Sequence, residues 1–271
     1  MGEQCSMDYA PRRPLIGVTG DIEPVPGSKA GAYRVRVAGA YLDALARAGR
    51  VPVVMYAEPD VAVSYARSLD GFLLTGGNDP DTTQWEGGGV PMHPMATPMH
   101  PQRQRFELAM LKALDDARDA RSTPPTLGVC LGMQLMGVHR AGIGALVQHL
   151  PDVIPTANQH GGEGLDSLHP IAATADWARS ELAGIAPSGA VASHHHQAVT
   201  KDVIVTKGRL RVLATSFDGV VEAFDDPSRP FYVGVQWHPE RTPDEGLGQG
   251  VIDKLVEAAR RAMERRGATA P

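Results

Sequence analysis

What this sequence lacks excludes several classes of protein. It has no apolar run of the roughly 18 residues that a membrane-spanning helix needs, and no cluster of basic residues. With 26 Lys and Arg against 31 Asp and Glu, the formal net charge is −5, so we expect neither a membrane nor nucleic acid as a partner. Its two cysteines are Cys5 and Cys130, and the N-terminus lacks the layout of a signal peptide. We therefore expect a cytoplasmic protein without disulfides.

The composition is that of a folded globular chain. Hydrophobic residues make up 42% of the 271 residues and charged residues 21%, which excludes wholesale disorder and leaves enough length for a core. The chain has neither an internal repeat nor a linker. We predict a flexible N-terminal tail over residues 1–13 and one domain over residues 14–265, with a small molecule or a protein as partner.

Short β-prone runs alternate with helical patterns in the first part of the chain. Apolar runs at 15–19, 51–55 and 71–75 predict strands, and apolar spacings of three and four residues predict helices over 33–49 and 60–68. Such alternation is typical of a parallel sheet with helices on both faces, so the expected fold class is α/β.

The rest of the chain continues this pattern with one change. We expect a loop over 78–101, helices over 102–118, from 131 and over 247–263, and strands over 126–129, 211–216, 220–224 and 231–236. The dipeptide Asp218-Gly219 favours a tight hairpin, which predicts an added antiparallel element. Residues 150–190 carry no clear pattern.

The segment Gly128-Val129-Cys130-Leu131-Gly132 lies between a predicted strand and a predicted helix. This is the context of a nucleophile elbow, where flanking glycines let strand and helix approach and the nucleophile is forced outward. The helix N-terminus also favours a thiolate. The alternative is a small buried cysteine that only packs.

A thiol nucleophile needs a base and a group that orients the base. His238 and Glu240 follow the last predicted strand, separated by Pro239, and side chains two residues apart on an extended segment share a face. The carboxylate can therefore hold the imidazole. Taken without Cys130, the same residues fit a strand end with a solvated histidine.

Backbone donors for an oxyanion are also available. The run Leu73-Leu74-Thr75-Gly76-Gly77 reads as a strand that ends in two glycines, and it can offer the N–H of Gly77 beside the N–H of Leu131. A simple turn is the alternative, because most glycine pairs after a strand are turns.

Together, these motifs resemble the class I glutamine amidotransferase superfamily. The motifs are Gly76-Gly77, Gly128-x-Cys130-x-Gly132-x-Gln134 and His238-Pro239-Glu240, within a resemblance from about residue 14 to 260. The sequence is most similar to γ-glutamyl hydrolases of the γ-glutamyl-γ-aminobutyrate hydrolase type. The resemblance implies a flavodoxin-like, doubly wound sheet with Cys130 as nucleophile, His238 as base and Glu240 as its orienting group.

The resemblance also implies residues that bind the γ-glutamyl portion of a substrate, namely Gly76, Gln134, Ser193, His194 and His195. Arg103 and Glu107 match an Arg-x-x-x-Glu pattern of these hydrolases. The chain departs from the family pattern at Asn78-Asp79-Pro80, Gln104, Ala192 and Gly142-Ile143-Gly144. These departures spare the predicted triad and concern the substrate class.

Histidines raise the question of a metal site. The adjacent His194, His195 and His196 cannot together bind one ion from a strand, because successive side chains alternate faces, and no Cys pair or His-Glu-x-x-His helix accompanies them or His93, His100, His160 and His169. We predict neither a metal nor a cofactor. Residues 85–101, rich in Met, His and Pro, fit a lid or partner surface as well as a solvated loop.

The leading hypothesis is a cysteine-dependent hydrolase that releases glutamate and an amine from a γ-glutamyl compound through a thioester on Cys130. A glutaminase subunit that supplies ammonia to a separate synthase is the first alternative. A non-catalytic binding protein on the same fold is the second. A homodimer is left open.

Overall fold

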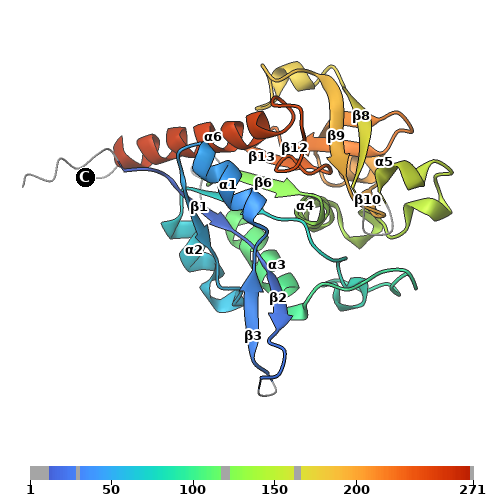
Figure 1. The fold of residues 1–271 in the computed structure, drawn as a ribbon, viewed down its shortest axis with the longest axis horizontal. Helices are drawn as coiled ribbons and strands as arrows, with labels where there is room; N and C mark the ends of the chain where they lie inside the picture. Colours follow the sequence, from blue (N-terminus) through green and yellow to red (C-terminus); the bar gives the residue numbers. More distant parts are fainter. Residues whose placement is uncertain (1–11, 29–30, 117–122, 162–165, 269–271) are drawn as a thin grey trace, which may run out of the picture.

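The computed structural model describes residues 12–28, 31–116, 123–161 and 166–268. Cys5 and residues 1–11 of the predicted tail lie outside the described residues. Nine strands form one sheet in the order β4-β1-β5-β6-β13-β12-β11-β8-β9 (Figure 1). Their bounds are β1 (Leu15–Val18), β4 (Val51–Val54), β5 (Gly71–Leu74), β6 (Thr126–Val129), β8 (Ser167–Ala173), β9 (Ser188–Ser193), β11 (Arg211–Ser216), β12 (Val221–Asp225) and β13 (Tyr232–Val235).

The sheet changes direction at β13. From β4 to β13 all neighbours are parallel, whereas β12, β11, β8 and β9 follow antiparallel. The predicted hairpin at Asp218-Gly219 joins β11 to β12, and Gly219 has the positive φ of 86° that such a turn requires. The predicted parallel sheet with an added antiparallel element is confirmed.

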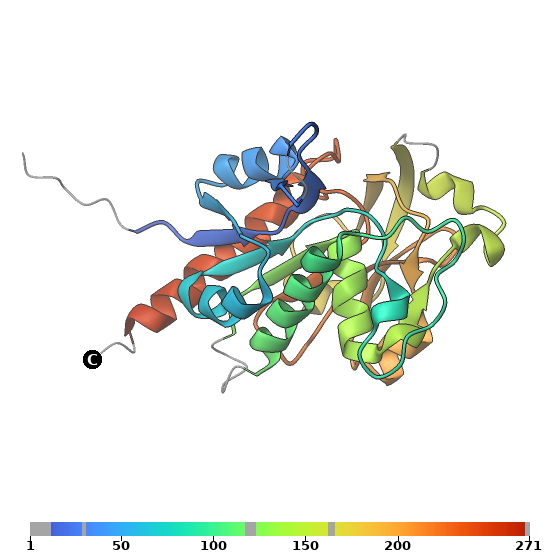
Figure 2. The same cartoon turned by 90° about the horizontal axis from the view of Figure 1, so that it is seen from below.

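Helices cover both faces of the parallel part (Figures 1 and 2). On one face, α1 (Gly39–Arg47) and α6 (Gln249–Ala268) share an apolar cluster with residues of β1, β5, β6 and β13. On the other face lie α2 (Ala62–Ser68), α3 (Pro101–Asp115) and α4 (Leu131–Ala141), and α5 (Lys201–Thr206) packs beside α4. This is the doubly wound α/β arrangement that the alternating pattern predicts.

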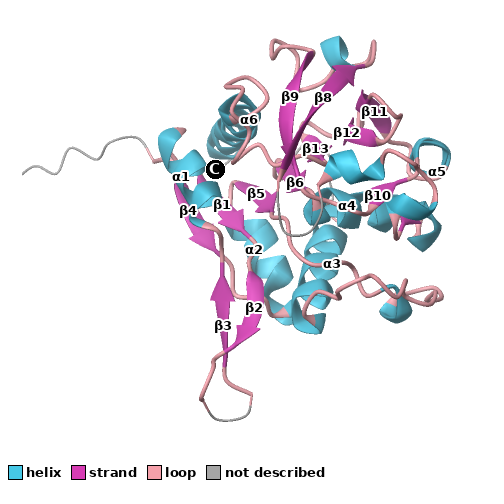
Figure 3. Cartoon of the chain, turned by 45° about the vertical axis from the view of Figure 1, so that its right-hand side comes forward, coloured by secondary structure: helices cyan, strands magenta, loops and turns pink. Residues whose placement is uncertain are grey.

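The helix predicted over 33–49 is wrong over its first turn. Residues 33–36 form β3 (Tyr33–Arg36), which pairs antiparallel with β2 (Asp21–Pro24) in a hairpin that projects from the body (Figure 3). Side chains alternate along β3, and Glu23 forms ion pairs with Arg34 and Arg36. Tertiary pairing with β2 therefore overrides the helical spacing, and the helix begins at Gly39.

The segment without a sequence pattern holds β8 and β9, which pair along six residues. It also holds short 3₁₀ helices, including η5 (Leu150–Asp152) and η6 (Ala157–His160). The two-residue strands β7 (Leu146–Val147) and β10 (Ala198–Val199) form a separate antiparallel pair. The 3₁₀ helices and the two-residue strands are too short for a periodic signal.

The parallel strands set the place of the functional residues. Because the carboxyl ends of parallel strands meet at one edge of a sheet, the segments that follow β5, β6 and β13 emerge side by side. These segments carry Gly76, Cys130 and His238, respectively.

Candidate active site

Cys130 lies at a strained turn between β6 and α4. Its φ of 50° and ψ of −107° lie outside the regions that non-glycine residues favour. A Cβ on Gly132 would press on the carbonyl of Leu74, and one on Gly128 would press on Met136. Only glycine permits this close approach, so the predicted strand-turn-helix geometry is present.

His238 and Glu240 lie together beside this turn. The Glu240 Oε1 atom is 2.8 Å from His238 Nδ1, and the backbone N–H of His238 donates to the carbonyl of Ala192 on β9. Because Nδ1 faces Glu240, Nε2 is the nitrogen left for Cys130. The imidazole is almost fully buried, at 7% exposure.

Two opposing effects act on the pKa of His238. Burial lowers it, but hydrogen bonds and charge interactions with Cys130 and Glu240 outweigh burial and raise the pKa to about 9. His238 therefore holds its proton through the neutral range. The Cys130–His238 pair combines a nucleophile with an acid for a leaving group.

Tyr41 on α1 completes this arrangement, and the sequence analysis missed its role. Its hydroxyl is 3.4 Å from His238 Nδ1 and accepts a hydrogen bond of 3.1 Å from the N–H of Gly76. Burial, followed by the negative charge of Glu240, raises the pKa of the phenol. In the sequence Tyr41 is one apolar position of a helical stripe, which gives no signal of a polar role.

The turn after β5 is held by a buried guanidinium. Arg103 on α3 donates to the carbonyls of Thr75 and Gly76 at 3.0 and 3.1 Å, and it pairs with Glu107 at 2.7 Å and with Asp21. A Cβ on Gly77 would press against this guanidinium. Because Tyr41 takes the N–H of Gly76, the next N–H along the chain is that of Gly77, whose role as an oxyanion donor stays a prediction.

A cavity of about 700 Å³ opens beside Cys130. Of the residues expected to bind substrate, Gln134, His194 and His195 line it together with Gly77, whereas Gly76 and Ser193 are not among the described lining residues. The Ser193 hydroxyl instead donates to the carbonyl of His160 at 2.9 Å. The remaining lining residues are Asn78, Asp79, Met95, Thr97, His149, Pro151, Ile154, Pro155, Ala157, Gly161, His196 and Gln197.

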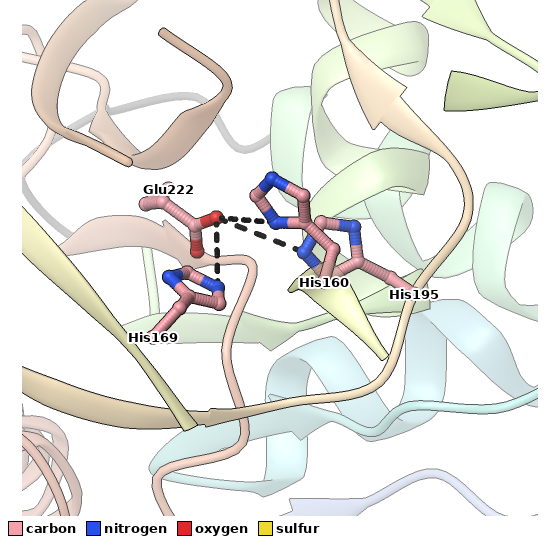
Figure 4. Close-up of side chains that lie close together, drawn as sticks. All are labelled: His160, His169, His195 and Glu222. Carbon is pink, nitrogen blue, oxygen red and sulfur yellow. Dashed lines mark ion pairs between the residues drawn. The ribbon is translucent and has the colours of Figure 1, made fainter. Parts of the chain in front are cut away.

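The adjacent histidines face different surroundings. The carbonyl oxygen of His194 is 3.8 Å from the Cys130 Sγ atom. His196 contacts both carboxylate oxygens of Asp79 at 3.0 Å, and Asp79 belongs to the predicted loop, which lines the cavity through Met95 and Thr97. His195 directs its imidazole into a buried group with His160, His169 and Glu222 (Figure 4). The sequence analysis did not connect these four residues.

Comparison with known proteins places the chain in a family. A Mycobacterium tuberculosis protein provisionally named a glutamine amidotransferase is 30% identical over 253 residues, 91% of this chain and 75% of that protein. The γ-glutamyl-γ-aminobutyrate hydrolase of Escherichia coli K12 is 29% identical over 221 residues, 76% of this chain and 78% of that enzyme.

Solved structures show the same fold at low sequence identity. A Thermoplasma acidophilum protein, provisionally described as part of a GMP synthase, superposes with a TM-score of 0.58 and 16% identity, covering 94% of this chain and 99% of that one. The glutaminase domain of Trypanosoma brucei CTP synthase gives 0.57 and 14%, covering 92% and 94%. Residues 14–240 match the peptidase C26 family. The chain thus belongs to this family of class I glutamine amidotransferase-like proteins.

Proposed function

We propose that the protein hydrolyses the γ-amide bond of a γ-glutamyl compound, with Cys130 as nucleophile, His238 as acid and base, and Glu240 as the group that orients His238. The observation that carries this proposal is a strained cysteine that lines a cavity at a helix N-terminus and lies next to a buried imidazole–carboxylate pair. The family and the E. coli relative support a hydrolase of glutamyl amides.

The first half of the proposed reaction forms a thioester. The Cys130 sulfur attacks the γ-carbonyl carbon, and the carbonyl oxygen becomes an oxyanion between the N–H groups of Gly77 and Leu131. Leu131 is the first residue of α4, so its N–H has no carbonyl within the helix to bond. His238 donates its proton to the departing nitrogen, the C–N bond breaks, and the amine leaves.

The second half releases glutamate. His238, now neutral, takes a proton from water, whose oxygen attacks the thioester carbon. The C–S bond breaks, glutamate leaves, and the proton returns to the Cys130–His238 pair. Gln134 and the His194–His195 backbone are the proposed contacts of the γ-glutamyl portion, since they line the cavity beside Cys130.

The size of the cavity favours a substrate larger than glutamine. About 700 Å³ lies within the range of sites that hold drug-sized ligands. Met95, His149 and Ile154 line it in addition to the residues near Cys130, and they leave room for an amine portion. A glutaminase subunit remains the second candidate, because one structural neighbour is described as part of a GMP synthase and the other as the glutaminase domain of CTP synthase.

The decisive experiment measures glutamate release by the purified chain from glutamine and from a panel of γ-glutamyl amines and peptides. We expect release from a γ-glutamyl amine to exceed release from glutamine, and Cys130→Ala to abolish it while the circular dichroism spectrum is unchanged. An intact-mass gain equal to one γ-glutamyl group on Cys130 would identify the thioester. Undiminished release by Cys130→Ala would refute the mechanism.

The same panel separates the alternatives. A glutaminase subunit would act on glutamine and respond to an added synthase. A binding protein would release nothing, and its Cys130 would react with iodoacetamide no faster than Cys5.

A further inference from the structure

The buried group of His160, His169, His195 and Glu222 has at its centre polar atoms that lack hydrogen-bond partners (Figure 4). These residues come from η6, β8, the turn after β9 and β12, and all are buried. One ligand atom from each lies within 4.8 Å of the others. His160 Nδ1, His169 Nε2, His195 Nε2 and both Glu222 oxygens have no hydrogen-bond partner among the described residues. Unpaired buried polar atoms are costly and require an explanation.

In each imidazole one nitrogen faces Glu222 and the other, which we call the outer nitrogen, faces away from it. Each outer nitrogen already has a hydrogen-bond acceptor. His160 Nε2 is 3.1 Å from an Asp218 carboxylate oxygen, His169 Nδ1 is 3.2 Å from the carbonyl of Pro170, and His195 Nδ1 is 2.9 Å from the carbonyl of Gln197. Carbonyls and carboxylates only accept hydrogen bonds, so each outer nitrogen carries a hydrogen. In a neutral imidazole the inner nitrogen, which is the one that faces Glu222, then presents a lone pair.

Three lone pairs and a carboxylate therefore converge on one point. A proton on one imidazole would supply a single donor to Glu222 and leave the other two nitrogens facing negative charge. A divalent cation satisfies all four atoms at once.

The distances from Glu222 to the three imidazoles fit a tetrahedral ion. Glu222 Oε1 is 3.4, 3.5 and 3.7 Å from the inner nitrogens of His160, His169 and His195. These separations exceed those of good hydrogen bonds. With zinc–ligand bonds of about 2.0–2.1 Å, neighbouring ligand atoms of a tetrahedron stand roughly 3.3 Å apart.

Charge and outer contacts fit as well. The positive charges of Zn²⁺ would be balanced by the carboxylates of Glu222 and Asp218. Asp218 is itself held by the hydroxyls of Thr156 and Ser216 at 2.8 and 2.6 Å. A carboxylate that orients a metal-binding histidine is a common outer shell of zinc sites.

A second group gives a contrast within the same molecule. His93 Nε2 and His149 Nδ1 each lie 3.0 Å from an oxygen of Asp152, and the carboxylate is 56% exposed. Here the polar atoms satisfy one another and face solvent, so no cation is required.

We propose that His160, His169, His195 and Glu222 bind one Zn²⁺ in a structural site, which goes beyond the proposed hydrolase activity. Four protein ligands close the coordination sphere, as in structural zinc sites. The ion would join η6, β8 and β12 to the turn that carries His194 and His195. Because the His195 N–H also donates to the carbonyl of His160, the ion would fix the cavity wall next to Cys130.

The test measures metal content in the full chain after removal of any affinity tag. The protein is incubated with Zn²⁺, desalted and analysed by inductively coupled plasma mass spectrometry. We expect about one zinc per chain, and less than about a tenth of that in His169→Ala and Glu222→Gln. His139→Ala is the matched control, because His139 pairs with Asp115 away from the cluster, and it should keep the full equivalent.

A second measurement holds even if the variants fail to fold. Stripping wild-type protein with a chelator should lower its melting temperature, and adding Zn²⁺ should restore it with an end point at one equivalent, whereas Mg²⁺ should not. Wild-type protein that takes up less than about a tenth of an equivalent, or ligand variants that keep a full one, would overturn the proposal. Glutamate release enters neither measurement, so failure of the proposed activity leaves this test intact.

Discussion

At the residue scale, the chemistry of the candidate site depends on the proton held by His238. Since contacts with Cys130 and Glu240 raise the pKa of His238 to about 9, the general acid is present below that pH and is lost as pH rises through it. We expect kcat/KM to fall above about pH 9. A pH profile of glutamate release measures this fall, which forms the alkaline limb of the profile.

Glu240→Gln tests the cause of that limb. Loss of the carboxylate removes one of the two groups that raise the pKa of His238, so the limb should move to lower pH and kcat should fall by roughly 10²–10⁴-fold. Glu245→Gln, a substitution of the same type in the segment that follows, is the control. An unmoved limb in Glu240→Gln would argue against His238 as the titrating group.

Tyr41→Phe isolates a hydroxyl that positions the site. The variant leaves the partly buried N–H of Gly76 without its acceptor, which costs about 1 kcal/mol of unfolding free energy, and it removes a polar neighbour of His238. We expect a lower kcat with little change in KM, together with a shifted pH limb. Denaturant titration and steady-state kinetics measure both effects.

Tyr65→Phe is the matched control for that substitution. Its hydroxyl also accepts a backbone N–H, that of Tyr56, but away from the cavity. If both variants reduce kcat equally, the proposed role of Tyr41 in positioning His238 is wrong.

At the scale of elements, the approach of β5 to α4 depends on Gly132. A Cβ there would press on the carbonyl of Leu74, so Gly132→Ala should force the strand and helix apart and lower the unfolding free energy by about 1–3 kcal/mol. At Gly144 a Cβ would meet no atom within 4 Å, and Gly144→Ala should be nearly neutral. Thermal unfolding of the two variants side by side measures the difference.

Arg103 links α3 to the turn after β5. Arg103→Met would leave the fully buried Glu107 carboxylate without its partner, a loss of about 3–5 kcal/mol in unfolding free energy. The double variant Arg103→Met/Glu107→Leu should recover most of that stability, because the fully buried charge is gone and Asp21, which also loses its partner, is partly exposed.

Activity should respond differently in that double variant. The carbonyls of Thr75 and Gly76 still lack the guanidinium that holds them, so the N–H of Gly77 loses its fixed position, and kcat should stay low. Full recovery of both stability and kcat would show that Arg103 serves stability alone.

Elements were predictable from sequence where they are long or where glycine or proline residues mark their ends. The core strands, α3, α4 and α6 follow from apolar spacing, and Cys130 and the His238–Glu240 pair follow from motifs. The hairpin of β2 and β3 was not predicted. The residues of β3 have a helical apolar spacing, but their pairing with β2 overrides it. The role of Tyr41 and the grouping of His160, His169, His195 and Glu222 depend on contacts between distant segments, which no local pattern encodes.

At the scale of the whole molecule, the cavity lies where the parallel and antiparallel parts of the sheet meet. Cys130 comes from the parallel part, whereas His194 to Gln197 follow β9, the last antiparallel strand. The loop between β5 and α3 joins them, since Asp79 accepts a hydrogen bond of 2.7 Å from the N–H of Thr97 and contacts His196 across the cavity. Neither part alone encloses the cavity.

Asp79→Ala should therefore loosen the cavity without touching the nucleophile. The loop loses its side-chain contacts with Thr97 and His196, so we expect KM to rise by about 3–10-fold, kcat to change less, and hydrogen exchange to accelerate over residues 80–99. Asp81→Ala is the control, because among the residues that the structure describes the Asp81 carboxylate bonds only to nearby Thr83. If Asp81→Ala raises KM as much as Asp79→Ala does, the contact between Asp79 and His196 does not shape the cavity. If Asp79→Ala lowers kcat and leaves KM unchanged, the loop acts on the reacting groups and not on substrate binding.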